Sequence, residues 1–241
     1  MIPILFLAAA LTDLSGDPAR VAACQKLIQA DAKAAVEQAT AWADRDKSVP
    51  ARQCLGLAFV AIERWDPAEA ALTQAAAQAD ADHDARGFSL WSQAGNAALA
   101  GDHHAKARED LDHVTAASAA PATLRGEAWI DRARADVALG ELAQARTDMD
   151  KGLALVPQDP FAWYLSASLA RKQSDLARAQ KDIATALKSA SDDAAVQLEA
   201  GNIYAAAGQP AAAQAAWTRA AQLAPDTPEG QAAKAALAAP K

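Results

Sequence analysis

The chain has 241 residues and a formal net charge of −7, and 71 of its residues are alanine. Alanine is the strongest helix former, whereas the branched and aromatic residues that favour strands are scarce, with aromatics at 5%. The composition therefore argues against an all-β or α/β fold and predicts an all-α one. The acidic balance also argues against nucleic-acid binding, because a protein that neutralises phosphates needs a basic surface.

Residues 1–11 are almost wholly apolar and contain an Ala-x-Ala pattern at Ala8 and Ala10. This segment resembles the end of a secretory signal, although it lacks the positively charged start of one. The alternative is an apolar stretch that packs on the first helix. We expect a periplasmic or secreted protein, with a cytoplasmic one as the alternative. No integral membrane span is expected, because no window reaches the roughly 18 apolar residues that a span requires.

Residues 12–48 are predicted to hold a degenerate helix pair over Asp17–Lys47. The only two cysteines, Cys24 and Cys54, fall on helices of this pair and of the repeat that follows it. Two buried thiols that act as small apolar side chains are one interpretation. A disulfide that ties the degenerate pair to the first regular repeat is the other, and the signal-like segment and the even cysteine count favour it.

From residue 49 onwards the same columns of residues recur five times. Three abutting blocks of 34 residues, 126–159, 160–193 and 194–227, follow two looser blocks, 49–82 and 88–121. Short insertions, His83–Gly87 and Ala122–Arg125, separate the looser blocks from the next ones. Each block has a small residue on its first helix, then a turn, then an alanine on its second helix. The small residues are Gly56, Gly95, Ala133, Ala167 and Gly201, and the alanines are Ala68, Ala107, Ala145, Ala179 and Ala213.

The small residues are expected where the two helices of a pair cross, because only a small side chain permits close contact. Met149, Ile183 and Trp217 follow on the second helices and are expected to fill the gap towards the next unit. Two blocks end in a proline, which cannot continue a helix. Within residues 228–241, Pro228–Ala239 is predicted to be a final capping helix, which covers the last apolar face of a repeat array.

These columns resemble the tetratricopeptide repeat, a helix–turn–helix unit of 34 residues. The resemblance implies a right-handed α-solenoid in which the first helices line a concave groove, where an extended peptide or a helix of a protein partner docks. Residues at helical spacing on these helices are the candidate contacts, with Phe161 and Tyr164 as aromatic anchors. The full set is Gln93, Asn96, Asp131, Arg134, Phe161, Tyr164, Ser168, Arg171, Lys172, Glu199 and Asn202. The alternative is that Asn96 and Asn202 belong to the consensus scaffold and that Arg171 and Lys172 are only solvated.

One variant of the family clamps a C-terminal carboxylate. Here Asp131 occupies the column that corresponds to Asn96 in the next unit, and its charge would repel such a ligand, so a chaperone-tail receptor is not expected. Residues 126–159 carry four Lys and Arg against seven Asp and Glu, whereas residues 160–193 carry five against four. This difference predicts a partner with a basic segment followed by an acidic one.

No catalytic or metal-binding pattern stands out. Glu109 and His113 have helical i, i+4 spacing, but no third metal ligand accompanies them. The Asp-x-Asp-x-Asp run from Asp80 breaks where a calcium loop needs glycine, and no phosphate-binding or nucleophile motif occurs. We expect no enzyme, no cofactor and no metal. The predicted function is a non-catalytic protein–protein interaction scaffold. An accessory subunit of a bacterial envelope-assembly or secretion complex is the first alternative, and self-association through a solenoid end is another.

Overall fold

The computed structural model describes residues 18–239, which form thirteen helices and no strand. The chain divides into two compact units, which we call the N-terminal unit (18–141) and the C-terminal unit (142–239). The N-terminal unit holds α1 (Pro18–Ala30), α2 (Ala32–Asp46), α3 (Val49–Ala61), α4 (Trp65–Ala81), α5 (Gly87–Ala100), α6 (His104–Thr115) and α7 (Ala122–Ala138). The C-terminal unit holds α8 (Leu142–Leu155), α9 (Pro160–Lys172), α10 (Leu176–Ala186), α11 (Ala194–Ala206), α12 (Pro210–Leu223) and α13 (Pro228–Ala238). The predicted all-α fold is confirmed, and the signal-like segment 1–11 lies outside the described residues.

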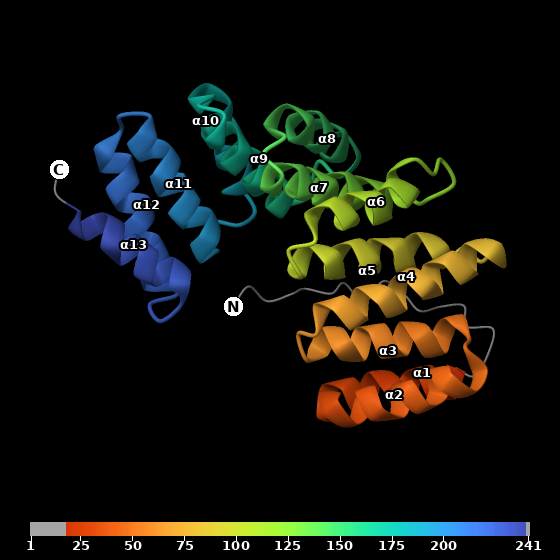
Figure 1. Ribbon diagram of the computed structural model, residues 1–241. Helices are drawn as coiled ribbons and strands as arrows, with labels where there is room; N and C mark the ends of the chain where they lie inside the picture. Colours follow the sequence, from red (N-terminus) through yellow and green to blue (C-terminus); the bar gives the residue numbers. More distant parts are fainter. Residues whose placement is uncertain (1–17, 240–241) are drawn as a thin grey trace. The chain divides into compact units, whose positions relative to one another are not determined.

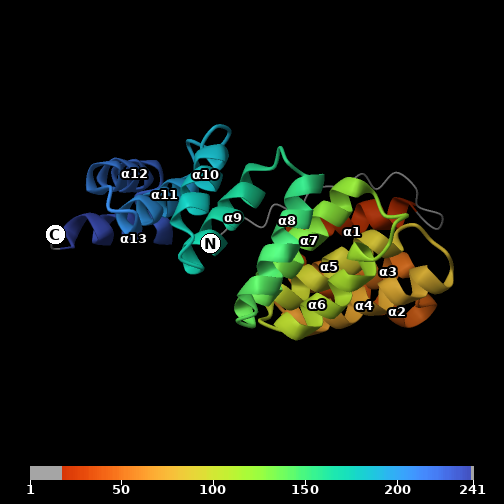
Figure 2. The same ribbon diagram turned by 90° about the horizontal axis from the view of Figure 1, so that it is seen from above.

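Helix pairs stack side by side within each unit. In the N-terminal unit each helix from α1 to α7 packs on the next, and α1 also contacts α3 as α5 contacts α7 (Figure 1). In the C-terminal unit the helices from α8 to α13 pack in the same consecutive way, and α11 contacts both α9 and α13 (Figure 2). First helices of neighbouring pairs therefore touch one another at α1 and α3, α5 and α7, α9 and α11, and α11 and α13, as stacked repeats require.

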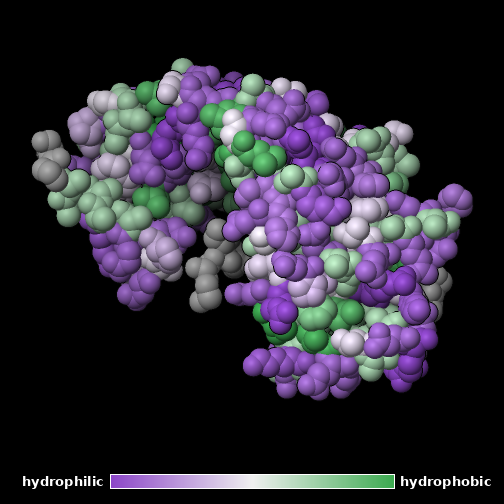
Figure 3. Space-filling model, viewed as in Figure 1, coloured by the Kyte–Doolittle hydropathy of each residue, from purple (hydrophilic) through white to green (hydrophobic). Residues whose placement is uncertain are grey.

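Each unit has a core of its own between these layers. Leu72, Leu90 and Leu111 lie fully buried in the N-terminal unit, and Ile183 and Ile203 in the C-terminal unit. Much of the remaining core is alanine. Hydrophilic residues cover most of the surface visible in Figure 3, with apolar residues in smaller patches between them. Within residues 18–239, no helix combines the length and the apolar character that a bilayer crossing requires.

The turn inside each of the five predicted repeats has the same backbone conformation. Its central residue lies in the left-handed region, with φ of 57° at Glu63, 60° at Asp102, 81° at Gly140, 63° at Ser174 and 71° at Gly208. The next N–H in each turn donates to the carbonyl five residues back, a Schellman-type ending of the first helix. Only two of the five residues are glycine, so hydrogen bonds and packing impose this conformation on the other three.

The helices of a pair cross where the first helix has glycine. A Cβ atom on Gly95 would lie 2.6 Å from Leu111 Cγ and 3.3 Å from the carbonyl oxygen of Ala107. At Gly56 it would lie 2.5 Å from Leu72 Cγ. The facing leucine side chain therefore leaves no room for even a methyl group, and the helices meet closely at these positions, as the sequence predicts.

Trp217 corrects one detail of the sequence prediction. Its indole was expected to fill the gap towards the next unit, but it lies against Gly201 of its own helix pair. The missing side chain at Gly201 leaves the space that the indole occupies. Trp217 Nε1 also donates to Asn202 Oδ1 at 3.1 Å, which fixes the ring at this crossing.

A second correction concerns Ala122–Arg125, which the column spacing assigned to an insertion. These residues form the first turn of α7, directly after Pro121. Because alanine-rich sequence favours helix, the spare residues lengthen the first helix instead of forming a loop.

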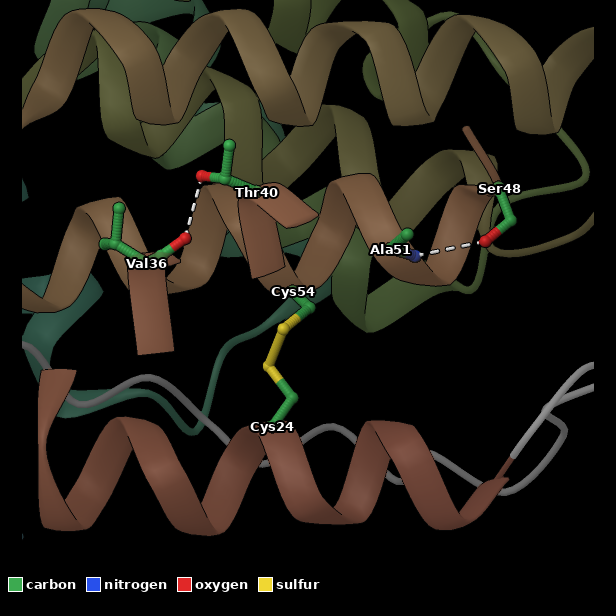
Figure 4. The surroundings of a disulfide bond; sticks show 6 residues. All are labelled: Cys24, Val36, Thr40, Ser48, Ala51 and Cys54. Carbon is green, nitrogen blue, oxygen red and sulfur yellow. Dashed lines mark hydrogen bonds between the residues drawn. A yellow bond between two sulfur atoms is a disulfide. The ribbon is translucent and has the colours of Figure 1, made fainter. Parts of the chain in front are cut away.

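A disulfide joins the N-terminal helix pair to the first regular repeat (Figure 4). Cys24 on α1 is bonded to Cys54 on α3, with their Cα atoms 6.2 Å apart. Both cysteines are buried beside Val21, Trp42 and Ala51. Of the two interpretations that the sequence left open, the structure contains the disulfide and not two free thiols. This bond links α1 to α3.

We predict that Gly95→Ala lowers the free energy of unfolding by about 1–3 kcal/mol, because the added methyl overpacks the crossing. This loss should occur despite the helix propensity of alanine, which favours the variant by about 1 kcal/mol. In a Leu111→Ala background, where the opposing side chain is shortened, the same change should be neutral or stabilising. Urea unfolding of the four proteins measures this coupling, and an equal effect of Gly95→Ala in both backgrounds would contradict it.

The disulfide predicts that a Cys24→Ser/Cys54→Ser variant loses about 3.5 kcal/mol of stability in the N-terminal helices, since a closed loop of this length restricts the unfolded chain. Hydrogen exchange should accelerate in α1 and stay unchanged in α11. Intact mass of the wild type should rise by two hydrogens on reduction. Reductant should not alter the double variant, which serves as the control, and unchanged exchange in α1 would refute the tethering role.

Candidate functional site

The candidate binding residues fall into two sets, one in each unit. Gln93 and Asn96 lie on α5, and Asp131 and Arg134 on the adjacent α7; we call this surface the α5–α7 face. The other seven lie on the neighbouring helices α9 and α11, which form the α9–α11 face. This second set is Phe161, Tyr164, Ser168, Arg171, Lys172, Glu199 and Asn202. Each face is described below by itself.

The α5–α7 face combines polar groups that are already bonded with an amide that is not. Gln93 Oε1 accepts a hydrogen bond from Gln53 Nε2 of α3 at 3.2 Å. Arg134 Nη1 donates to Asp131 Oδ1 at 2.8 Å within α7. Asn96 is partly buried, and within residues 18–239 its side-chain amide forms no hydrogen bond. The face therefore presents amide groups that are free to bind a ligand, beside an ion pair that is already satisfied.

On the α9–α11 face, Arg171 and Glu199 form a two-bond ion pair. Arg171 Nε lies 2.7 Å from Glu199 Oε1, and Nη2 lies 3.1 Å from Oε2. The hydrogen bond to Glu199 raises the pKa of Arg171, and the Glu199 side chain is only 8% exposed. Asn202 Nδ2 donates to Glu199 Oε2 at 3.4 Å. These residues therefore bind one another. The positive charge of Arg171, which the sequence analysis counted in the net charge of residues 160–193, is neutralised by Glu199.

Phe161 and Tyr164 remain as the aromatic part of this face. Their ring centroids are 5.7 Å apart with an interplanar angle of 30°, and Phe161 is 47% exposed, the highest value among the exposed large apolar residues in the described chain. Burial raises the pKa of Tyr164, and the carboxylates of Glu199 and Asp193 act in the same direction. Ser168 is partly buried, and Lys172 is exposed at the end of α9.

The second helices hold a column of buried aspartates that sequence reasoning missed. Asp110, Asp148 and Asp182 occupy the same position in three successive blocks and are at most 2% exposed. Each contacts the residue four positions before it: Lys106 at 3.5 Å, Gln144 at 2.9 Å and Arg178 at 3.2 Å. The recurrence of Lys, Gln or Arg four residues before Asp was a signal that could have revealed this column.

In the C-terminal unit this column extends into a network across three helices. Ser166 Oγ on α9 donates to Asp182 Oδ2 on α10 at 2.6 Å, and Arg146 Nη2 on α8 donates to Ser166 Oγ at 2.8 Å. Because these carboxylates are enclosed by protein groups, they hold the layers together and are not accessible to a ligand.

Asp110 differs from the other two aspartates. Its Oδ2 has no hydrogen-bond partner within the described residues. Burial raises the pKa of Asp110 to about 6, although the nearby Lys106 opposes this and Glu69 adds to it. A carboxyl group with this pKa is partly protonated at mildly acid pH.

The histidines bind neighbouring side chains in separate places. His103 Nδ1 lies 2.9 Å from Glu69 Oε2, a hydrogen bond that raises the pKa of His103. The His113 ring stacks on Trp91 with a centroid distance of 3.7 Å. No group of three or more His, Cys, Asp or Glu side chains within residues 18–239 is placed to hold a metal ion.

Comparison with known proteins identifies the repeat. Residues 126–169 match the family described as tetratricopeptide repeat. A comparison with curated proteins found no match to the chain.

Many solved structures share the fold, and three of them show how low the sequence identity is. PilW, described as a widely conserved type IV pilus biogenesis factor, is 17% identical with a TM-score of 0.73, over 88% of this chain and 95% of that one. PilF of Pseudomonas aeruginosa is 16% identical with a TM-score of 0.70, over 90% and 95% of the two chains. YrrB, described as a TPR protein with an unusual peptide-binding site, is 16% identical with a TM-score of 0.56, over 83% and 99%.

Asp110 predicts a pH dependence of stability. Its folded-state pKa is raised above the unfolded value, so the folded state binds the proton more tightly, and stability falls as pH rises from about 4 through 6. Asp110→Asn cannot ionise, so its stability relative to wild type should rise by roughly 3 kcal/mol between pH 4 and 7.5. Urea unfolding across this range measures the difference. Asp44→Asn, at an exposed carboxyl of α2, is the control and should follow the wild type; a flat difference for Asp110→Asn would refute the assignment.

Proposed function

Because the chain is a tetratricopeptide-repeat protein, we propose that it is a non-catalytic scaffold that binds a peptide or helix of a protein partner on the faces of its first helices. The observation that carries this proposal is the set of unused groups on those faces. The Asn96 amide has no partner in the described chain, and nearly half of Phe161 is open to solvent. A peptide supplies backbone groups for the amide and side chains for the aromatic ring.

The polar groups of these faces suit binding better than catalysis. Arg171 and Glu199 neutralise each other, as do Asp131 and Arg134. General-base catalysis needs a free proton acceptor within hydrogen-bond reach of the group that it deprotonates. Because these two ion pairs occupy the charged groups, the amide, hydroxyl and aromatic groups are the ones available to a partner.

A more specific role is an accessory subunit of a bacterial envelope-assembly complex, acting in the periplasm. The support is that PilW, a type IV pilus biogenesis factor, and PilF share the fold over most of the chain. The disulfide between Cys24 and Cys54 and the signal-like segment 1–11 favour an oxidising compartment. The proposed division of the chain has four parts. They are the signal-like segment 1–11, a degenerate helix pair at 12–48, five repeats over 49–227, and a capping helix and tail at 228–241. Self-association through an exposed helix remains the alternative to a separate partner.

Selection of random displayed peptides against the full chain tests the proposed scaffold. We expect selected peptides whose affinity falls about fivefold to tenfold in Asn96→Ala or Phe161→Ala, the size of one lost hydrogen bond or aromatic contact. Gln74→Ala, an exposed amide on the second helix α4, is the matched control and should leave the affinity unchanged. Isothermal titration with each variant gives these ratios. Peptides that are insensitive to both first-helix variants and sensitive to Gln74→Ala would contradict the proposal.

A further inference from the structure

A cavity of about 260 Å³ lies between α1 and α2, beside the disulfide. Its α1 wall runs from Arg20 to Leu27, and its α2 wall runs from Ala35 to Arg45. Arg20 lies 3.8 Å from Asp46, so the start of α1 lies beside the end of α2. The cavity therefore has the two arginines at one end, and Leu27 and Ala35 at the other, near the turn between the helices.

Between its two ends the cavity is mostly apolar. Alanines and the Cys24–Cys54 disulfide line it together with the indole of Trp42, and Gln38 is the polar exception. Trp42 Nε1 donates to Asp46 Oδ2 at 2.5 Å, so the one polar group of the indole is already bonded. Sulfur atoms in a disulfide have no S–H group to donate. The walls therefore suit an aliphatic chain.

The end of the cavity at Arg20 and Arg45 is cationic. Within residues 18–239 the exposed side chain of Arg45 forms no ion pair or hydrogen bond. Arg20 is 55% exposed, and its partner Asp46 also accepts hydrogen bonds from Trp42 Nε1 and the Ser48 N–H. Residues 18–48 carry five Lys and Arg against four Asp and Glu, whereas residues 49–141 carry eight against 14. The cavity therefore lies in the basic part of an otherwise acidic unit.

We propose that this cavity binds a medium-length alkanoate, with its chain between α1 and α2 and its carboxylate at Arg45. Residues 20 to 27 span about 10 Å along the axis of α1, a distance that an extended chain of this kind covers. Each methylene that leaves water favours binding, and a guanidinium can donate two parallel hydrogen bonds to a carboxylate. The site is separate from the α5–α7 and α9–α11 faces and goes beyond the scaffold function.

Other ligands match the cavity less well. A neutral aliphatic chain gains nothing from the charge of Arg45, and an aliphatic ammonium is repelled by both arginines. The C-terminal residue of a peptide has a carboxylate, but its side chain is too short to reach Leu27 and Ala35. Its backbone amide would also meet apolar walls that offer it few hydrogen bonds, which costs free energy.

Four small molecules test the proposal directly. Octanoate, octanol, octylammonium and N-acetyl-leucine are each titrated into the ¹⁵N-labelled full chain. The indole N–H signal of Trp42, identified by its loss in Trp42→Phe, reports on the cavity wall. We expect octanoate to shift this signal and the backbone amides of Ala23 and Leu27 in a saturable way. The other three molecules should shift them less at the same concentration.

Two variants with matched controls locate the site. Arg45→Ala should weaken octanoate binding about twofold to fivefold, the size of an exposed ion pair. Arg64→Ala removes another exposed arginine of the same unit, outside the cavity, and should have no effect. Ala23→Leu places a larger side chain in the cavity and should weaken binding about fivefold or more. Ala22→Leu makes the same change at the next exposed position, outside the cavity, and should leave binding unchanged.

Three results would overturn the proposal. One is octanol that shifts the Trp42 signal as strongly as octanoate, which would make the site an apolar cavity without selection for a carboxylate. Another is N-acetyl-leucine that binds at least as tightly, which would make it a receptor for a peptide C-terminus. The third is an equal effect of Ala23→Leu and Ala22→Leu, which would place the ligand elsewhere. The scaffold function is tested separately, by the response of selected peptides to Asn96→Ala and Phe161→Ala.

Discussion

The close approach of the two helices in each pair is the constraint on which the rest of the structure depends. At Gly56 and Gly95 the facing leucine leaves no room for a methyl group, and at Gly201 an indole takes that space. An alanine-rich core has little side-chain volume, so it gains contact only if the backbones come close. One helix pair cannot bury enough apolar area in this way, and each pair must therefore stack on the next.

Much of this architecture could be predicted because its determinants are local and repeat in sequence. The recurring small residue, turn and alanine place the helices. In the structure the turns within the repeats have one backbone conformation even at Glu63 and Ser174, where the residue itself does not favour it. The two errors have physical causes. At Ala122–Arg125 helix propensity outweighed the column spacing. For Trp217, a column shows that a residue is buried but not which neighbouring helix it faces.

The candidate site was less predictable, because it depends on which side chains pair across helices. Spacing places Arg171 on an open face, but its partner Glu199 comes from the next first helix, 28 residues later. The register of two stacked helices decides that pair, and no single-helix pattern contains it. Phe161, in contrast, is exposed on this face, and exposure requires no partner within the chain. The buried aspartates show the same limit, since Ser166 and Asp182 meet only after α9 and α10 pack.

The two units differ in net charge, and they therefore differ in how they can act on a charged partner. Residues 18–141 carry 13 Lys and Arg against 18 Asp and Glu, whereas residues 142–239 carry nine against ten. The N-terminal unit therefore has the field that attracts a basic partner over distances up to the screening length, about 8 Å at physiological salt. The C-terminal unit has no net field of this kind, so a charged side chain can be selected there only by groups that touch it. Five of its ten acidic side chains, those of Asp148, Asp150, Asp182, Asp192 and Glu199, form ion pairs within the unit. Asp159, Asp175 and Asp193 instead accept cap hydrogen bonds at helix starts.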